Sequence, residues 1–455
     1  MTEDTTPDIP AEGSALEEAR RLTTLAWPVI IGQVGFILMG VVDLIVVGML
    51  GEGPQASLAL GNTWSFGVLI IGMGVLMGLD PVFSQAAGAR DKAVMGRAMV
   101  QATALGLLLS VPLIVAHLLT TPALTFFEQP PEIVPGAAEY CWAIALGLPG
   151  SMVFFALRSF LQGQGIVRPA TLVIVVANVL NVFVDVWFTL GGLGLEPMGV
   201  FGCGLATSLV RTFMPVALIA VSWSTLRGCW PGLAPAFELS ALKSLLLIGL
   251  PVGVQVAMEV EAFNFVGLMM GWISPAALAG NAVALNVSSL SFMVPFGISA
   301  AAATRVGNLL GAGLQWGRTA WVAIGVGIVF MCSSALLFFF APGAIARLYT
   351  ADADVLAVAV GLLPLAACFQ LFDGAQVVSF GVLRGAGDTR VPPLFNLLGY
   401  WALGIPVGYF LGFKLGWGPE GIWTGLILAL MVVSVMLLFR VRVVQRRGGA
   451  RVVVG

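Results

Sequence analysis

The chain is a succession of apolar runs, each about as long as a bilayer is thick, separated by short breaks with charged residues, Gly or Pro. A membrane helix needs about 20 consecutive, mostly apolar residues. In a bilayer core only helices and closed barrels satisfy their own backbone hydrogen bonds, and runs of this length match helices. We therefore expect an all-α polytopic membrane protein with twelve transmembrane helices, at 22–48, 56–80, 93–119, 134–157, 168–191, 199–226, 243–271, 277–303, 317–345, 355–382, 392–413 and 420–440.

The composition excludes several classes of protein. Only 10% of the 455 residues are charged, against about 25% in soluble domains. The 21 Lys and Arg nearly balance the 23 Asp and Glu, so there is no basic surplus with which to bind nucleic acid. The five cysteines are scattered and there is one histidine, which predicts no disulfide framework, no resident metal site and no cofactor apart from a coupling ion.

The Lys and Arg residues indicate the orientation in the membrane. Twelve spans place both termini on one side, and the even-numbered loops and the tail hold most of the basic residues, whereas the opposite face has only Arg347 and Lys414. Cytoplasmic loops are enriched in Lys and Arg. We expect a multi-pass protein of the cytoplasmic (inner) membrane, with cytoplasmic tails at 1–21 and 441–455.

An internal repeat divides the chain. The stretch Leu161-Gln-Gly-Gln-Gly-Ile-Val-Arg-Pro169 resembles Leu383-Arg-Gly-Ala-Gly-Asp-Thr-Arg-Val-Pro392, and Leu25-Ala-Trp-Pro28 resembles Ile248-Gly-Leu-Pro251. Two six-helix lobes are expected, at 22–226 and 243–440, joined by a cytoplasmic linker at 227–242. Because each half has an even number of spans, the lobes should be related by an axis along the membrane normal, with a central cleft for substrate.

Ionisable residues inside the first lobe mark a candidate ion site, because a charge in the bilayer core costs at least about 2.5–3.5 kcal/mol. Asp43 and Asp185 lie at similar expected depth, and Asn178, Asn181 and Asp185 share one helical face. Carboxylates and amides can bind a hard monovalent cation, and two nearby carboxylates can bind a proton. The alternative is a buried hydrogen-bond network that only joins helices.

The second lobe has acids in spans 7 and 10. Gln255 lies one turn before Glu259 and Gln376 lies three residues after Asp373, so each acid belongs to a polar stripe. Such acids can attract cationic substrates or relay protons, although they could also be neutral buried groups. Glu261 should point about 200° away from Glu259 along the helix, and one of the two should face the cleft.

Three further polar residues have structural interpretations. Arg211 is the only basic residue deep in a span, and we expect it to pair with Asp185 or a tail carboxylate. His117 and Asp80 lie near span ends, where we expect a cap or interfacial role for the histidine and an interfacial position for the aspartate.

Several motifs together resemble the multidrug and toxic compound extrusion (MATE) family, in particular its NorM-like branch. They are Leu25-Ala-Trp-Pro-Val29, Met39-Gly-Val-Val-Asp43, Glu259-Val-Glu-Ala-Phe263, Ala284-Leu-Asn-Val-Ser-Ser-Leu290, Arg305-Val-Gly307, Asp373-Gly-Ala-Gln-Val-Val378 and Leu383-Arg-Gly-Ala-Gly-Asp-Thr389. The resemblance implies a V-shaped exporter, open outward between its lobes. This sequence reads Ala279-Gly-Asn-Ala282, where many NorM-like members have a histidine, so Asn281 cannot titrate.

The resemblance also implies roles for individual residues. Asp43, Asn178, Asn181 and Asp185 match the first-lobe positions associated with H⁺ or Na⁺, and Glu259 and Asp373 match the second-lobe acids associated with cation binding and drug export. We expect substrate contacts from Glu259, Asp373, Gln255, Gln376 and Asn286.

The predicted function is secondary active multidrug efflux. The protein would work as a monomer among membrane lipids and exchange lipophilic or cationic compounds for H⁺ or Na⁺ by alternating access, with H⁺ favoured. No GxxxxGK[ST] phosphate loop is present. A lipid-linked oligosaccharide flippase is the alternative, but a pyrophosphate would need a basic cleft and Arg211 is the only deep basic residue. An intramembrane enzyme is disfavoured because Asp43 and Asp373 lie in different lobes, so we expect no catalytic residues.

Overall fold

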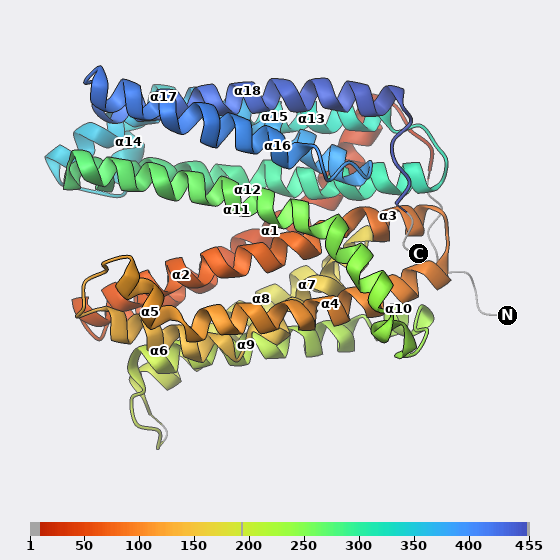
Figure 1. Cartoon of the computed structure of the whole chain (residues 1–455), viewed down its shortest axis with the longest axis horizontal. Coiled ribbons are helices and arrows are strands. Elements are labelled where there is room, and N and C mark those ends of the chain that lie inside the picture. Colours follow the sequence, from red (N-terminus) through yellow and green to blue (C-terminus); the bar gives the residue numbers. More distant parts are fainter. Residues whose placement is uncertain (1–9, 193, 453–455) are drawn as a thin grey trace. The chain divides into compact units, whose positions relative to one another are not determined.

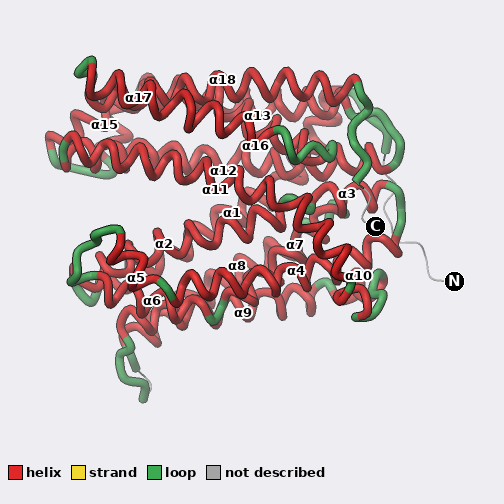
Figure 2. Tube along the Cα trace, in the orientation of Figure 1, coloured by secondary structure: helices red, strands yellow, loops and turns green. Residues whose placement is uncertain are grey.

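The computed structural model describes residues 10–192 and 194–452, and across these ranges every regular element is a helix (Figures 1 and 2). Among the described residues, eleven helices are long and apolar enough to cross a membrane, and the bent pair α6 (Val134–Ala145) and α7 (Leu148–Gly163) brings the number to twelve if it is counted as one span. The prediction of an all-α polytopic protein with twelve spans is therefore confirmed, with the bent pair counted as one span.

The first half of the chain contains ten α-helices: α1 (Ala15–Gly48), α2 (Glu52–Met77), α3 (Asp80–Gly88), α4 (Lys92–Leu118), α5 (Thr120–Phe126), α6 (Val134–Ala145), α7 (Leu148–Gly163), α8 (Arg168–Leu190), α9 (Gly199–Val221) and α10 (Trp223–Gly228). After a 3₁₀ turn η1 (Ala234–Phe237) come α11 (Leu239–Ile273), α12 (Pro275–Gly311), α13 (Gly317–Phe340), α14 (Pro342–Arg347), α15 (Ala353–Gly385), α16 (Pro392–Asn396), η2 (Leu397–Gly404), α17 (Ile405–Tyr409), η3 (Phe410–Lys414) and α18 (Gly418–Arg446).

The chain forms two compact units, and two long helices are each divided between them. Unit 1 contains residues 1–30, 88–90 and 254–452, and unit 2 contains residues 31–87, 91–253 and 453–455. The division in α1 follows Pro28 by two residues, and the division in α11 follows Pro251 by two residues. A proline inside a helix removes one backbone hydrogen bond and kinks the axis. Residues 22–30 thus pack with unit 1 and residues 243–253 with unit 2, whereas the sequence assigned them to the first and second lobes respectively.

Each unit has its own packed helices. In unit 1, α15 packs against α12, α13 and α18. In unit 2, α9 packs against α6, α7 and α8, and α4 packs against α7. Small residues allow close approach of helix backbones: a Cβ added at Gly253 of α11 would lie 2.8 Å from the Ile71 carbonyl oxygen of α2.

The bend between α6 and α7, which is 52°, has an identifiable cause. Gly147 precedes α7 and Pro149 lies in its first turn, where proline prevents a continuous helix. The Ser208 hydroxyl of α9 accepts a hydrogen bond from the Gly147 amide (3.1 Å) and donates one to the Ala143 carbonyl (2.6 Å). The backbone groups released by the break are thereby satisfied, and the orientation of α6 relative to α9 is fixed.

The eleventh span, Pro392–Lys414, is irregular. It contains π-helical turns at η2 and η3, which alternate with short α-helical pieces. In a π-helix the hydrogen bonds run from i to i+5, so the turn is wider, and such turns are frequent at functional sites. Asn396 and Tyr400 lie at the start of this irregular segment.

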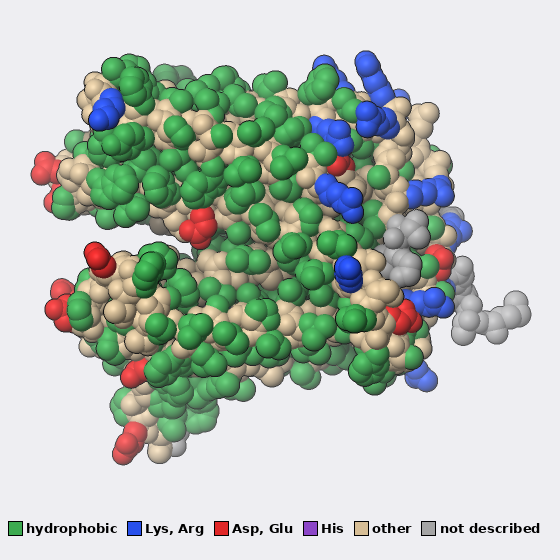
Figure 3. Space-filling model, viewed as in Figure 1, with side chains coloured by type: hydrophobic (Ala, Val, Ile, Leu, Met, Phe, Trp, Pro, Cys, Tyr) green, Lys and Arg blue, Asp and Glu red, His purple; other side chains and the backbone are tan. Residues whose placement is uncertain are grey.

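Basic and acidic side chains lie toward opposite ends of the helices in each unit. On the face shown in Figure 3, most Lys and Arg residues gather at one end of each unit, and several Asp and Glu residues lie at the opposite end, with apolar side chains between. This is the arrangement from which the membrane orientation was predicted.

Candidate functional site

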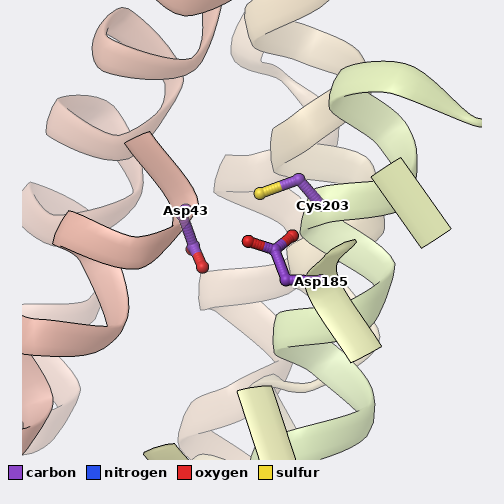
Figure 4. Close-up of side chains that lie close together, drawn as sticks. All are labelled: Asp43, Asp185 and Cys203. Atoms are coloured by element: carbon purple, nitrogen blue, oxygen red, sulfur yellow. The ribbon is translucent and has the colours of Figure 1, made fainter. Parts of the chain in front are cut away.

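The first candidate site lies inside unit 2, where three helices bring two acids and a thiol together. Asp43 of α1, Asp185 of α8 and Cys203 of α9 point toward one another (Figure 4). One ligand atom from each, two carboxylate oxygens and the sulfur, all lie within 4.8 Å of one another. None of the three side chains is more than 2% exposed. Asp43 and Asp185 are close together, in agreement with the similar membrane depth that the sequence predicts for them.

Three donors surround the Asp43 carboxylate. The Thr207 hydroxyl donates to Oδ2 at 3.0 Å and the Tyr140 hydroxyl donates to the same oxygen at 3.4 Å. The Asn181 side-chain amide donates to Oδ1 at 3.5 Å. Tyr140 is held in position by the bend after α6, and Thr207 lies one turn beyond Cys203 on α9. The donors therefore come from α6, α8 and α9, so packing of the whole unit determines this geometry.

Asp185 has a different set of contacts. Its Oδ1 accepts a hydrogen bond from the Thr189 hydroxyl at 3.0 Å, whereas its Oδ2 is buried without a hydrogen-bond partner. The Asn181 Oδ1 is also buried and unpartnered. An unsatisfied buried oxygen costs roughly 1–3 kcal/mol, and two nearby carboxylates repel each other strongly at low dielectric. A proton or a cation bound between them would relieve both costs.

Asn178 does not join this cluster. Its amide donates to the Ile174 carbonyl of its own helix at 2.9 Å. Asn178 and Asp185 share a helical face, but seven residues of α-helix separate them by about 10 Å along the axis. Conversely, Tyr140, Thr207 and Cys203 were not predicted, because uncharged side chains in apolar spans carry no cost that singles them out.

The second candidate site lies in unit 1 and is centred on Glu259 of α11. Its Oε1 accepts from the Gln376 amide of α15 at 3.0 Å, and its Oε2 accepts from the Asn396 amide at 3.1 Å. The Tyr400 hydroxyl, 3.5 Å from Oε1, also exchanges hydrogen bonds with Gln376. Asn396, the last residue of α16, and Tyr400 of η2 thus contact the same carboxylate. Glu259 and Gln376, predicted separately, therefore belong to one network.

The other predicted residues of the second lobe are less closely connected. Asp373 is buried, within electrostatic range of Glu259. Gln255 is buried and its Oε1 has no hydrogen-bond partner. Asn286 is exposed on α12. Glu261 is exposed and contacts Asn264 at 3.4 Å, so it and Glu259 occupy different environments, as their helical spacing predicts.

The expected pairing of Arg211 is wrong. Arg211 makes no ion pair with Asp185 or with a tail carboxylate among the described residues, and its Nη1 is buried without a hydrogen-bond partner. Arg211 lies one turn beyond Thr207 on α9, and its positive charge interacts electrostatically with Asp43. Asp80 is buried inside the protein.

His117 is likewise fully buried and contacts Ser65 at 3.0 Å and the Leu113 carbonyl at 2.8 Å. His117 lies in the last turn of α4, so its contact with the Leu113 carbonyl caps the helix end, as one of the two expected roles requires. Its contact with Ser65 also joins α4 to α2. Asn281 stands where many NorM-like members have a histidine. Its side-chain oxygen accepts a hydrogen bond from the Trp423 indole at 2.9 Å. Its part in the structure is to connect α12 with α18.

Comparison with known proteins gives the family. The MatE family model matches twice, at residues 28–187 and 251–410. The two matches have the same length and begin at Pro28 and Pro251, the pair of prolines that the internal repeat aligns. The repeat predicted from the sequence is therefore confirmed.

Similar proteins cover almost the whole chain. The multidrug resistance protein PmpM of Pseudomonas aeruginosa is 34% identical over 449 residues, which is 94% of this chain and 92% of that protein. A probable multidrug resistance protein NorM of Mesorhizobium japonicum is also 34% identical and covers 93% of both chains. Among solved structures, the eukaryotic MATE transporter AtDTX14 aligns with a TM-score of 0.86 at 22% identity, over 96% of this chain and 100% of that one. The chain therefore belongs to the MatE family.

Proposed function

We propose that this chain is a secondary active multidrug exporter, which moves lipophilic or cationic organic compounds out of the cell in exchange for H⁺ or Na⁺ by alternating access. It acts in the cytoplasmic membrane with both termini in the cytoplasm, as a monomer and without a resident cofactor. The multidrug resistance proteins that it resembles at 34% identity support the substrate class.

The main support for ion coupling is the buried pair of acids, Asp43 and Asp185. Both acids are buried beside each other, and oxygens of Asp185 and Asn181 have no hydrogen-bond partner. Such groups cost free energy, and here two of them lie on residues of one cluster around two acids. A site that binds and releases an ion needs them.

The ligand set of the first site favours H⁺ over Na⁺. A hard cation requires several oxygen ligands at once, whereas the first site brings two carboxylate oxygens and one sulfur together. Cys203 contributes sulfur where Na⁺ would need another oxygen. A proton needs only one carboxylate oxygen.

The Glu259 network is the proposed site for the cationic group of the substrate. Gln376, Asn396 and Tyr400 hold the carboxylate in one orientation, so its negative charge is available at a fixed position. Aromatic residues lie next to it, since Phe263 contacts both Tyr400 and Phe369. A carboxylate beside aromatic faces can attract a lipophilic cation.

The driving energy is sufficient for export. For a neutral substrate, one inward-moving ion gains about 2.3 kcal/mol per 100 mV of membrane potential, and a pH or Na⁺ gradient adds to it. For a monovalent cationic substrate exchanged one for one, no net charge moves, so the pH or Na⁺ gradient alone supplies the energy. About 1.4 kcal/mol corresponds to a tenfold concentration ratio, so a tenfold ion gradient sustains a tenfold outward gradient of such a cation.

Reconstitution of the purified protein in proteoliposomes tests the proposal. Transport of a fluorescent cationic dye is measured with an imposed ΔpH in Na⁺-free buffer and, separately, with an imposed Na⁺ gradient at equal pH. We expect ΔpH-driven transport that Asp43→Asn abolishes and Asn178→Ala preserves. Wild-type transport by Asp43→Asn, or no dye movement under either gradient, would refute the proposed mechanism, and dependence on Na⁺ alone would exclude H⁺ as the coupling ion.

A further inference from the structure

The thiol of Cys203 hydrogen-bonds Asp185 within the first candidate site, a contact that the proposed function does not use. A second buried cysteine, Cys141, belongs to the same apolar cluster of unit 2. The Cys141 thiol donates to the Gly61 carbonyl at 3.4 Å, as a structural cysteine would. The Cys203 sulfur instead points at the Asp43 and Asp185 carboxylates (Figure 4). The two cysteines thus share a core but face different chemical groups.

Unsatisfied oxygens point to a ligand at the same place. Asp185 and Asn181 are both fully buried, and one oxygen of each has no hydrogen-bond partner. Figure 4 shows the Asp185 carboxylate directed toward Asp43 and Cys203. The cluster therefore offers a sulfur, carboxylate oxygens from two acids and an uncommitted amide oxygen to one small volume.

We propose that Asp43, Asp185 and Cys203 form a binding site for one thiophilic divalent cation of the Zn²⁺ class. Such ions take thiolate and carboxylate ligands together in tetrahedral sites, with the Asn181 oxygen or a water as the fourth ligand. Mg²⁺ and Ca²⁺ prefer ligand sets made only of oxygen, so the sulfur selects against them.

The geometry is close to what the metal requires. The three ligand atoms lie within 4.8 Å of one another, whereas ligands of a tetrahedral Zn²⁺ lie about 3.5 Å apart for bonds of about 2.0–2.3 Å. Closing this difference requires movements of about 1 Å at most.

Metal binding has a consequence for transport, which rests on the proposed function. The divalent cation occupies the coupling site and displaces the protons that the carboxyl and thiol groups hold. A bound metal therefore prevents the proton cycle and inhibits efflux. Binding itself does not depend on the proposed function, so the two parts can be tested separately.

The binding test uses Cd²⁺, whose thiolate complexes absorb in the ultraviolet. Cys229, Cys332 and Cys368 are first replaced by Ser to remove the less buried thiols, and the purified protein is titrated with CdCl₂ in detergent. We expect one Cd²⁺ per chain with a thiolate absorption band. In that background Cys203→Ala should weaken binding at least tenfold and remove the band, whereas the matched variant Cys141→Ala should retain both.

Two further variants test the same site in case Cys203→Ala does not fold. Cys203→Ser preserves the volume of the side chain and Asp185→Asn removes a carboxylate, so a folding defect of one variant does not hide the result. Both should bind Cd²⁺ at least tenfold more weakly while eluting as monodisperse protein. Equal Cd²⁺ affinity in the Cys203 and Cys141 variants, or no binding to the parent protein, would overturn the proposal.

In proteoliposomes, Cd²⁺ should inhibit ΔpH-driven dye efflux by the parent protein and by Cys141→Ala, and Cys203→Ala should require at least tenfold more Cd²⁺ for the same inhibition. If Cd²⁺ binds at Cys203 while no efflux is seen without it, the metal site stands and the proposed function fails. If efflux is normal and Cd²⁺ does not bind, the metal site fails and the proposed function stands.

Discussion

Glu18 and Arg305 form a bidentate ion pair inside unit 1, between the beginning of α1 and the middle of the chain's second half. The Arg305 Nη2 lies 2.9 Å from Glu18 Oε1, and its Nε lies 3.2 Å from Oε2. Glu18 is fully buried and also accepts from the Thr319 hydroxyl at 2.9 Å. The same guanidinium donates to the Pro10 carbonyl at 2.8 Å. The amino-terminal segment is therefore attached to α12 and α13 by buried polar contacts.

Removal of this pair should destabilise the protein. Breaking a buried ion pair costs about 3–5 kcal/mol, because the remaining charge is left without compensation. We expect Glu18→Gln to lower Tm by several degrees in detergent and to expose the amino-terminal segment to limited proteolysis. The neighbouring Glu17 is exposed, so Glu17→Gln is the control and should leave both measurements unchanged. A Glu18→Gln variant with the Tm and proteolysis pattern of the control would show that the pair contributes nothing.

The two asparagines of α8 should differ in function. Asn181 donates to Asp43, whereas Asn178 bonds only to its own helix. Removing a hydrogen bond to a charged group costs about 1.5–3 kcal/mol, so Asn181→Ala should reduce ΔpH-driven dye transport about tenfold or more. Asn178→Ala should retain most of the wild-type rate. The initial rates are compared in proteoliposomes at equal protein amounts, and similar losses in both variants would contradict this account of the cluster.

Glu259 and Glu261 should also differ. Glu259 is held by Gln376, Asn396 and Tyr400, whereas Glu261 is exposed. Glu259→Gln should impair transport of cationic dyes strongly, because it removes the negative charge that the network positions. Glu261→Gln should change the rate less than twofold. Equal impairment would mean that the exposed acid participates directly, and a neutral lipophilic substrate provides a check, since its transport should depend less on Glu259.

His117 should be structural and not a proton relay. It connects Ser65 of α2 with the Leu113 carbonyl of α4, and it is fully buried. We expect His117→Gln to lower Tm, since a buried hydrogen bond left unmade costs about 1–3 kcal/mol. Dye efflux per folded molecule should remain near the wild-type level. Ser65→Ala removes the same contact from the other side and should lower Tm without affecting efflux. A well-folded His117→Gln protein that has lost ΔpH-driven transport would indicate a relay.

The sequence predicts the parts of the fold that depend on local pattern. Runs of apolar residues predict the spans, because a bilayer accepts little else, and the repeat of Pro28 at Pro251 predicts two related halves. Charged residues such as Asp43 and Glu259 stand out because their insertion is costly. These signals can be read from one segment at a time.

The remaining features depend on which helices become neighbours. Tyr140 of α6 meets Asp43 of α1, and Asn396 of α16 meets Glu259 of α11, and each pair is about 100 residues or more apart in the sequence. A three-ligand site made from Asp43, Asp185 and Cys203 spans more than 150 residues of sequence, so no local spacing predicts it. The division of α1 after Pro28 also depends on packing, because it falls inside the apolar part of the helix, where no charged residue marks it.

Close contact between α2 and α11 gives the last prediction. A Cβ at Gly249 would overlap the Val75 carbonyl oxygen of α2, and Gly253 meets Gly74 across the same contact. Backbone atoms cannot rotate away as a side chain can, so the helices would have to separate, at a cost of about 1–3 kcal/mol or more. Gly249→Ala should therefore lower Tm and the yield of monodisperse protein. Gly325 of α13 has no atom within 4 Å of its Cβ position, so Gly325→Ala should be neutral or stabilising by up to about 1 kcal/mol. The measurement is the Tm of the two alanine variants, determined side by side. Equal Tm values would show that α2 and α11 are not in such close contact.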